Sequence, residues 1–268
     1  MNMQIGFIGG GVMAEAIISG MTGSGIVDCS DVMASDLYST RRGYLKDTYG
    51  IEVTDNNTDV IEHSSIIFVA VKPQDIPNIG VDIASSVASN QTVVSIAAGI
   101  SINQMAEAFK TPNLIRVMPN TPAQVKSGMS VWMSTGSVSE AHVNMVKKIL
   151  DGIGKQYQVF DEKYIDMATG LSASGPAYIL MIIDALVDAG VFLGMPRAMS
   201  KMLAVQMIKG TSELVESSDL HLKELSDMVV SPGGTTAAGL LVLESQGIPH
   251  ALIRAVEAAY NKALELGN

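Results

Sequence analysis

An apolar strand that leads into a glycine-rich turn and then into a helix is the feature that most constrains the fold of this chain. The segment 5–8 is followed by Gly9, Gly11 and Ala14, which have the spacing Gly-x-Gly-x-x-Ala. In such a unit the first glycine allows a tight turn, the second lets a pyrophosphate approach the backbone, and the small third residue lets the helix pack closely on the strand. The motif therefore predicts a dinucleotide-binding domain; the alternative is a turn with only a structural role.

Short apolar runs alternate with helical patterns up to about residue 160. Runs rich in Val, Ile and Ala, separated by helices, are typical of a parallel sheet covered on both faces. Expected strands are 3–8, 31–35, 66–71, 92–96 and 114–118, and expected helices are 13–21, 40–49, 76–88 and 102–109. The segments 128–133 and 156–160, around a helix at 140–150, extend the sheet.

The chain changes character after about residue 161, where helical periodicity continues and no convincing strand follows. Pro176, Pro196 and Pro249 stand at or near first-turn positions, where the missing N–H costs nothing. Expected helices are 176–193, 196–215, 220–229, 235–246 and 249–266. The sequence therefore predicts an α/β fold, with a Rossmann-type dinucleotide-binding domain at 1–161 followed by an all-helical domain at 162–268.

The charge balance excludes one class of partner and favours another. Seventeen Lys and Arg against 27 Asp and Glu give a net charge of −10, which argues against nucleic acid because phosphate neutralisation needs a basic face. Only 16% of the residues are charged, below the roughly 25% typical of soluble domains. So little charge indicates an apolar face that a second subunit covers.

The cysteine and histidine content and the apolar stretches bear on metal binding, location and membrane insertion. A single cysteine, Cys29, excludes an intrachain disulfide, and no two of the four histidines have metal-ligand spacing, so we expect no metal and a cytoplasmic protein. The apolar segment that begins at Met3 leaves no room for a targeting peptide. Asp184 and Asp188 interrupt the most apolar stretch, which favours a buried or interfacial helix over a membrane span.

The end of the second expected strand bears on which dinucleotide is bound. An acidic residue there usually accepts hydrogen bonds from the ribose 2′-OH of NAD, whereas a hydroxyl and a nearby arginine suit the 2′-phosphate of NADP. Ser35, Arg41 and Arg42 favour NADP, and Asp36 would repel a phosphate if it pointed inward. The alternative for the two arginines is a solvated helix face.

The ends of three further strands carry candidate cofactor residues. Ligands of open parallel sheets lie off the carboxyl ends of the strands, so Lys72 points towards the cofactor crevice unless it only reaches water. Ala97 and Ala98 leave room for a nicotinamide ring, and prolines stiffen a loop that presents the amide of Asn120.

Two segments of the second half are unusual. Small residues fill 169–177 ahead of a long apolar helix, which indicates close helix packing. The segment 231–236, Ser-Pro-Gly-Gly-Thr-Thr, precedes another expected helix, so several N–H groups point out of a positive helix end. It predicts a site for a small anion such as a carboxylate; the alternative is an ordinary capped helix.

At these residues the sequence resembles the pyrroline-5-carboxylate reductase family over essentially the whole chain. The matching blocks include IRVMPNTPA at 115–123, GLSASGPAYI at 170–179 and ELSDMVVSPGGTT at 224–236. The resemblance implies an oxidoreductase that reduces the cyclic imine 1-pyrroline-5-carboxylate to L-proline, the last step of proline biosynthesis, with NADP(H) preferred and NAD(H) possible. It also implies a homo-oligomer, at least a dimer, in which the helical domains interleave and hold the substrate.

The resemblance carries site residues over by position. The cofactor residues are Ile8, Gly9, Gly10, Gly11, Val12, Met13, Ser35, Asp36, Asn57, Ala70, Val71, Lys72, Pro73, Ala97, Ala98 and Asn120. The substrate residues are Glu162, Met228, Ser231, Gly233, Gly234, Thr235 and Thr236. Two positions depart from the family: Met228 stands where a polar residue is common, and Asp36 is not typical of strict NADP use. Thr236 is the candidate catalytic residue, because its hydroxyl can orient the ring nitrogen and relay a proton from water.

Two other functions would fit parts of the pattern. β-Hydroxyacid dehydrogenases share the domain order but oxidise alcohols with a lysine early in the long helix, and no lysine occurs between Lys163 and Lys201. A regulatory module would bind NADPH without consuming pyrroline-5-carboxylate, so a single absorbance assay separates it from a reductase.

Overall fold

The computed structural model describes residues 3–266, and the chain divides into two compact units. The first holds the described residues up to Ser174 together with those from Ala258 onward, and the second holds Gly175–Glu257. The far end of the last helix thus belongs to the first unit. Each unit is described by itself.

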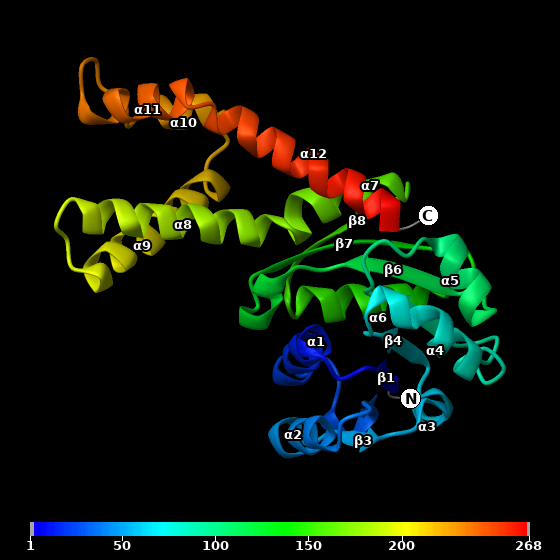
Figure 1. The fold of residues 1–268 in the computed structure, drawn as a ribbon. Helices are drawn as coiled ribbons and strands as arrows, with labels where there is room; N and C mark the ends of the chain where they lie inside the picture. Colours follow the sequence, from blue (N-terminus) through cyan, green and yellow to red (C-terminus); the bar gives the residue numbers. More distant parts are fainter. Residues whose placement is uncertain (1–2, 267–268) are drawn as a thin grey trace. The chain divides into compact units, whose positions relative to one another are not determined.

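The first unit is built on an eight-stranded sheet in the order β3-β2-β1-β4-β5-β6-β7-β8 (Figure 1). The strands are β1 (Ile5–Ile8), β2 (Val32–Ser35), β3 (Glu52–Thr54), β4 (Ile66–Val69), β5 (Thr92–Ser95), β6 (Leu114–Met118), β7 (Gly128–Ser134) and β8 (Gly154–Gln158). All neighbours pair in parallel except β6 and β7. Strands β3 to β6 have the doubly wound Rossmann order, which places ligands at the carboxyl ends of the strands. The predicted fold class is confirmed.

Helices cover both faces of this sheet, and the two larger of three apolar clusters among the described residues lie on its opposite faces. They are α1 (Val12–Gly23), α2 (Ser39–Tyr49), α3 (Asn57–His63), α4 (Ile76–Ile83), α5 (Ile102–Phe109), α6 (Glu140–Asp151) and α7 (Lys163–Ala168). One core joins Phe7 and Phe68, whose rings stack with centroids 5.0 Å apart, to α1 and α6. The other joins Ile8 and Val69 to α3, α4 and α5. Because successive strand residues point to opposite faces, Phe7 and Ile8 belong to different cores.

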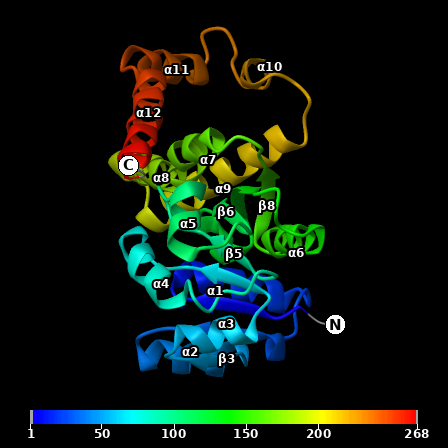
Figure 2. The same cartoon turned by 90° about the vertical axis from the view of Figure 1, so that its right-hand side faces the viewer.

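Figure 2 shows the strands in succession from β3, near one end of the first unit, to β8. Two elements at the β3 end were not predicted, namely β3 itself and α3. The edge strand has only three residues, and α3 begins where the Asn56 side chain accepts a hydrogen bond from the Thr58 N–H. The predicted helix 76–88 is too long: α4 ends at Ile83, and the chain continues through the polar segment 84–91 into β5.

The second unit is a set of helices with little core of its own. They are α8 (Gly175–Phe192), α9 (Arg197–Glu216), α10 (Leu222–Asp227), α11 (Thr235–Ser245) and most of α12 (Ile248–Leu266). The helices α8 and α9 lie side by side (Figure 1), so close that a Cβ on Gly190 would lie 2.1 Å from the Ser200 Oγ. That hydroxyl donates to the Val187 carbonyl. Val187 and Ser200 are among the few buried residues of these two helices.

The apolar side chains of the second unit are mostly exposed. Leu180 is 65% exposed, and Met181, Phe192, Met202 and Leu241 are exposed as well. The continuous helical run 163–192 is long and apolar enough to cross a membrane by length and composition, with a mean hydropathy of 1.6 over its most apolar window. Only 11% of that window is buried, so this surface is available for another apolar surface to cover.

Candidate active site

The glycine turn after β1 leaves open space where a cofactor backbone would lie. Gly9 has φ +93°, and a Cβ on it would lie 2.8 Å from the Ala70 carbonyl oxygen, so glycine is required there. A Cβ on Gly11, by contrast, would meet no atom within 4 Å. No side chain caps α1, and its first N–H groups face this space with the positive end of the helix dipole. The turn therefore fits a pyrophosphate.

Gly10, the middle glycine, is fixed from both sides by residues of the β2–α2 segment. Its N–H donates to the Asp36 Oδ2 at 3.0 Å, and its carbonyl accepts from the Arg41 Nε. The other carboxylate oxygen of Asp36 accepts from the Tyr38 N–H at 2.9 Å. Both oxygens of Asp36 therefore bind the chain itself, and the carboxylate holds the turn in shape.

The two arginines of α2 are not a solvated helix face. Arg41 binds the Glu15 carboxylate at 2.5 Å and also the Gly11 carbonyl. Arg42 donates to the carbonyls of Asp36 and Leu37 at 2.7 and 3.2 Å and binds the exposed Asp55. Arg41 thus ties α2 to the glycine turn and to α1, and Arg42 ties α2 to the loop at the end of β2.

Glu15 joins α1 to α2 through a cluster of hydrogen bonds. Its Oε1 accepts from Tyr44 at 2.9 Å and from Tyr49 at 2.8 Å, beside the ion pair with Arg41. Burial alone would raise the pKa of Glu15, but the hydrogen bonds from Arg41 and the two tyrosines hold the pKa below its usual value. Burial and the bond to Glu15 raise the pKa of Tyr49 to about 12.

Ser35 and Asn57, expected from the resemblance to hold the adenosine ribose and its phosphate, lie together. The Ser35 hydroxyl donates to the Asn57 Oδ1 at 2.7 Å. Ser35 ends β2 and Asn57 begins α3, so the pair lies at the carboxyl end of the sheet beside the glycine turn.

A pocket of about 250 Å³ opens beside the glycine turn at the ends of β4, β5 and β6. Six predicted residues line it: Gly11, Val12, Met13, Ala70, Val71 and Lys72. Sequence reasoning missed the other three, Ile96, Met118 and Pro119, although each follows or ends a predicted strand. The remaining predicted residues of this side, Pro73, Ala97 and Ala98, do not line it; Ala97 and Ala98 lie in the loop behind Ile96. The pocket is mostly apolar, as a nicotinamide ring requires.

Asn120 is built into the fold rather than presented to the pocket. Its Nδ2 donates to the Ser172 carbonyl at 3.0 Å, and its Oδ1 accepts from the Met129 N–H at 2.8 Å. The side chain thereby links the loop after β6 to β7 and to the π-helical turn Thr169–Ala173.

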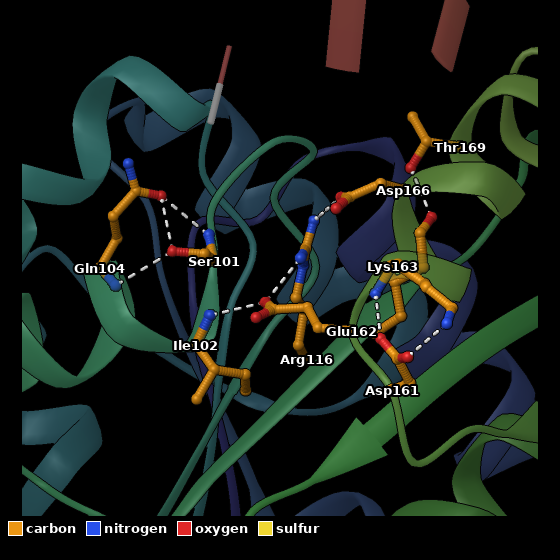
Figure 3. A network of polar contacts seen from close by, with 10 residues as sticks. Ser101, Ile102, Gln104, Arg116, Asp161, Glu162, Lys163, Asp166 and Thr169 are labelled. Atoms are coloured by element: carbon orange, nitrogen blue, oxygen red, sulfur yellow. Dashed lines mark hydrogen bonds and ion pairs between the residues drawn. The ribbon is translucent and has the colours of Figure 1, made fainter. Parts of the chain in front are cut away.

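Glu162 belongs to a buried ionic cluster that the sequence did not reveal (Figure 3). Arg116, only 2% exposed, donates from one guanidinium nitrogen to Glu162 and from the other to Asp166, each at 2.6 Å. The same Glu162 Oε1 accepts from the Ile102 N–H at 2.7 Å, at the start of α5. The cluster ties β6, α5 and α7 together, and Arg116 stands two residues before the pocket residue Met118.

The turn ahead of α11 has the features of an anion site. Gly233 has φ +71°, and Gly234 occupies the N-cap position with no side chain bonded to the first turn of the helix. The N–H groups that begin α11 are therefore left for another acceptor. Ser231, Thr235 and Thr236 are exposed around them. Met228, at the end of α10, is 71% exposed.

Comparisons with known proteins agree on one family. The model described as "Pyrroline-5-carboxylate reductase dimerisation" matches residues 162–266, and the model "NADP oxidoreductase coenzyme F420-dependent" matches residues 4–99. Pyrroline-5-carboxylate reductases of Synechocystis and Pisum sativum are 39% and 38% identical, over 100% and 98% of this chain and 99% and 95% of theirs.

Solved structures give the same result. The Plasmodium falciparum pyrroline carboxylate reductase with NADP bound is 32% identical, with a TM-score of 0.91, over 100% of this chain and 99% of that one. The Coxiella burnetii pyrroline-5-carboxylate reductase is 29% identical, also with a TM-score of 0.91, over 100% of both chains. A prephenate dehydrogenase from Aquifex aeolicus, 13% identical with a TM-score of 0.54, shares only the fold.

Proposed function

Because the chain belongs to the pyrroline-5-carboxylate reductase family, we propose that it reduces 1-pyrroline-5-carboxylate to L-proline and that the sites described above hold the two reactants. It is an oxidoreductase that uses NAD(P)H. The observation that carries the proposal is the open glycine turn beside a pocket of about 250 Å³.

The cofactor fits the first unit. The turn from Ile8 to Met13 would hold the pyrophosphate, because its middle glycine is already fixed and Gly11 leaves space. The Ser35–Asn57 pair would hold the adenosine ribose and its phosphate. We place the nicotinamide in the pocket lined by Ala70, Val71, Lys72 and Met118. We rank NADPH above NADH, since both oxygens of Asp36 already accept from main-chain N–H groups, which disfavours their use as acceptors for a ribose 2′-OH.

The substrate carboxylate fits the turn at 231–236. The uncapped N–H groups at the start of α11 supply donors and a positive dipole end without a basic side chain. Thr235, Thr236 and the N-cap Gly234 would clamp the carboxylate, with Ser231, Gly233 and Met228 around it. The resemblance gives Glu162 as a further substrate residue.

The chain's own residues orient the cyclic imine rather than activate it strongly. NADPH held by the glycine turn and the pocket would supply a hydride for the C5 atom of the imine, and the ring nitrogen would carry the one proton that the reduction adds. A threonine hydroxyl is too weak an acid to protonate that nitrogen unaided, so Thr236 holds the ring nitrogen and relays this one proton to it from water before the reduction. Fixing the carboxylate sets the face of the ring that meets the hydride.

We assign the cofactor and the substrate to two successive domains of the chain. We place the cofactor domain at 1–161 and the substrate and dimerisation domain at 162–268. Self-association is supported by the match to a dimerisation domain and by the exposed apolar helices α8 and α9. We further propose that these helices interleave with those of a second copy, so that the active site is completed across two subunits. The single cysteine and the family fit a cytoplasmic enzyme.

The test is a direct assay with purified protein. We expect NADPH absorbance to fall only when 1-pyrroline-5-carboxylate is added, and L-proline to form in equal amount. NADPH binding without consumption would instead show a regulatory module, and formation of NADPH from NADP⁺ with a β-hydroxyacid as substrate would show the other dehydrogenase class.

A further inference from the structure

Arg116 is unusual because stability alone does not favour a buried arginine at its position. It lies in the middle of β6, where its neighbours Ile115 and Val117 are fully buried, and its Nε is buried with no hydrogen-bond partner among the described residues. Replacing a buried ion pair by apolar side chains is often neutral or stabilising. The cluster of Arg116, Glu162 and Asp166, here called the β6–α7 ion cluster, therefore calls for a reason other than stability.

The geometry of the β6–α7 ion cluster leaves one carboxylate oxygen unused. The Glu162 Oε1 accepts both from Arg116 and from the Ile102 N–H, whereas no partner binds its Oε2 in the part of the chain that the structure describes. Glu162 is 30% exposed and Asp166 is 17% exposed. Arg116 thus fixes Glu162 by one oxygen, and the other oxygen has no partner among the described residues (Figure 3).

The β6–α7 ion cluster includes a residue on the same face of β6 as a residue that lines the pocket. Arg116 and the pocket residue Met118 are two apart on β6, so their side chains leave the same face. Met118 also packs in one apolar cluster with Ile165 of α7 and Ala98. The loop that follows β5 begins at the pocket residue Ile96 and leads into α5, whose first residue, Ile102, donates its N–H to Glu162.

The cluster carries a net negative charge. One guanidinium stands against two carboxylates, and the nearby pair of Lys163 and Asp161, at 2.7 Å, sums to zero. A net charge of one electron in a partly buried place attracts a cation much more strongly than a neutral group of the same shape. Of the two forms of a cyclic imine, only the protonated one is cationic, and it is also the better hydride acceptor.

We propose that the β6–α7 ion cluster selects the protonated form of the cyclic imine, with Glu162 facing the ring nitrogen, Asp166 making the net charge negative and Arg116 acting as the positioning residue. The proposal rests on the proposed function, since it takes the ring to be bound near Glu162. It assigns Arg116 and Asp166 a role through charge and orientation, not through contact with the substrate.

The experiment compares two ligands that differ in ring charge, with NADP⁺ present, by calorimetry. L-Proline has a cationic ring nitrogen, and cyclopentanecarboxylate has the same ring and carboxylate without it. Asp166→Asn keeps an oxygen for Arg116 and removes the charge. We expect it to weaken L-proline binding about tenfold, equivalent to about 1.4 kcal/mol, and to leave the Kd of cyclopentanecarboxylate within about twofold.

Asp82→Asn is the control, because it removes the same charge from an exposed residue of α4 that is not part of the cluster. We expect it to change neither Kd. Glu162→Gln is a second variant for the case that Asp166→Asn does not fold, and we expect the same loss of preference for L-proline. Arg116→Lys keeps the charge but cannot bind both carboxylates as a fork, so we expect the preference to fall there too while the melting temperature shows folded protein.

Different outcomes would contradict the charge selection by the β6–α7 ion cluster and the proposed reductase function. Equal weakening of both ligands by Asp166→Asn, or no weakening of either, would overturn the charge selection, and an unchanged preference in folded Arg116→Lys would overturn the positioning role. Failure of the unaltered protein to bind L-proline at all would instead contradict the proposed function.

Discussion

Gly11 gives the sharpest test of the cofactor site at the scale of one residue. A side chain there would meet no protein atom, so Gly11→Val should fold with a loss of no more than about 1 kcal/mol at this N-cap position. The same side chain would fill the space for the pyrophosphate, so the Kd for NADPH should rise by at least about tenfold in a fluorescence titration. Gly136→Val is the control, because Gly136 is equally open and lies far along the chain in a turn. An unchanged Kd for NADPH in Gly11→Val would show that the pyrophosphate does not lie on this turn.

Thr236 tests the substrate site at the same scale. Thr236→Ala should lower kcat by one to two orders of magnitude, equivalent to roughly 1.4–3 kcal/mol of barrier, because the ring nitrogen loses its partner. The Kd for NADPH should not change. Thr211→Ala is the control, since the Thr211 hydroxyl only bonds its own helix on the surface of α9. A kcat equal to that of the unaltered enzyme would remove Thr236 from the mechanism.

Individual residues also show which parts of the site could be predicted from the sequence and which could not. The glycine turn was predictable, because each glycine has its own steric task within a few residues. Arg116 was not, because its partners Glu162 and Asp166 lie about 50 positions away and only the fold brings them to β6. Asn120 was placed near the cofactor by its loop, but whether its amide faces a ligand or the chain depends on Ser172 and Met129.

At the scale of elements, the contact between α1 and α2 should make stability depend on alkaline pH. Burial and the hydrogen bond to Glu15 raise the pKa of Tyr49 from its usual 10.0 to about 12 in the folded protein. A raised folded-state pKa contributes stability below the unfolded value, and this contribution is lost as the pH rises from about 10 to about 12. Denaturant unfolding should therefore show a loss over this range that is smaller in Tyr49→Phe. An equal loss in both proteins would show that Tyr49 does not titrate in this way.

Elements were predictable where the core decides them. The strands β1, β4, β5 and β6 are fully buried and mostly apolar, and their positions followed from these apolar runs. The edge strand β3 and the short helices α3 and α7 were missed, because three to seven polar or mixed residues carry no period of their own and depend on tertiary contacts.

At the scale of the whole molecule, the exposed apolar surface of α8 and α9 predicts that assembly and activity go together. Leu180→Glu places a charge on that surface and should shift the protein from dimer or larger to monomer in analytical ultracentrifugation, with loss of turnover. Val81→Glu is the control, because Val81 is 82% exposed on α4, outside the helical unit. A demonstrated monomer with full activity would contradict an active site completed between subunits.

The measurement that bears most directly on the whole account is a crystal structure with NADP⁺ and L-proline bound. We expect the pyrophosphate to lie on the turn from Gly9 to Gly11, the proline carboxylate to accept from the N–H groups that begin α11, and the proline ring to lie against the nicotinamide. Proline bound away from the turn at 231–236, or a ring remote from the nicotinamide, would contradict it.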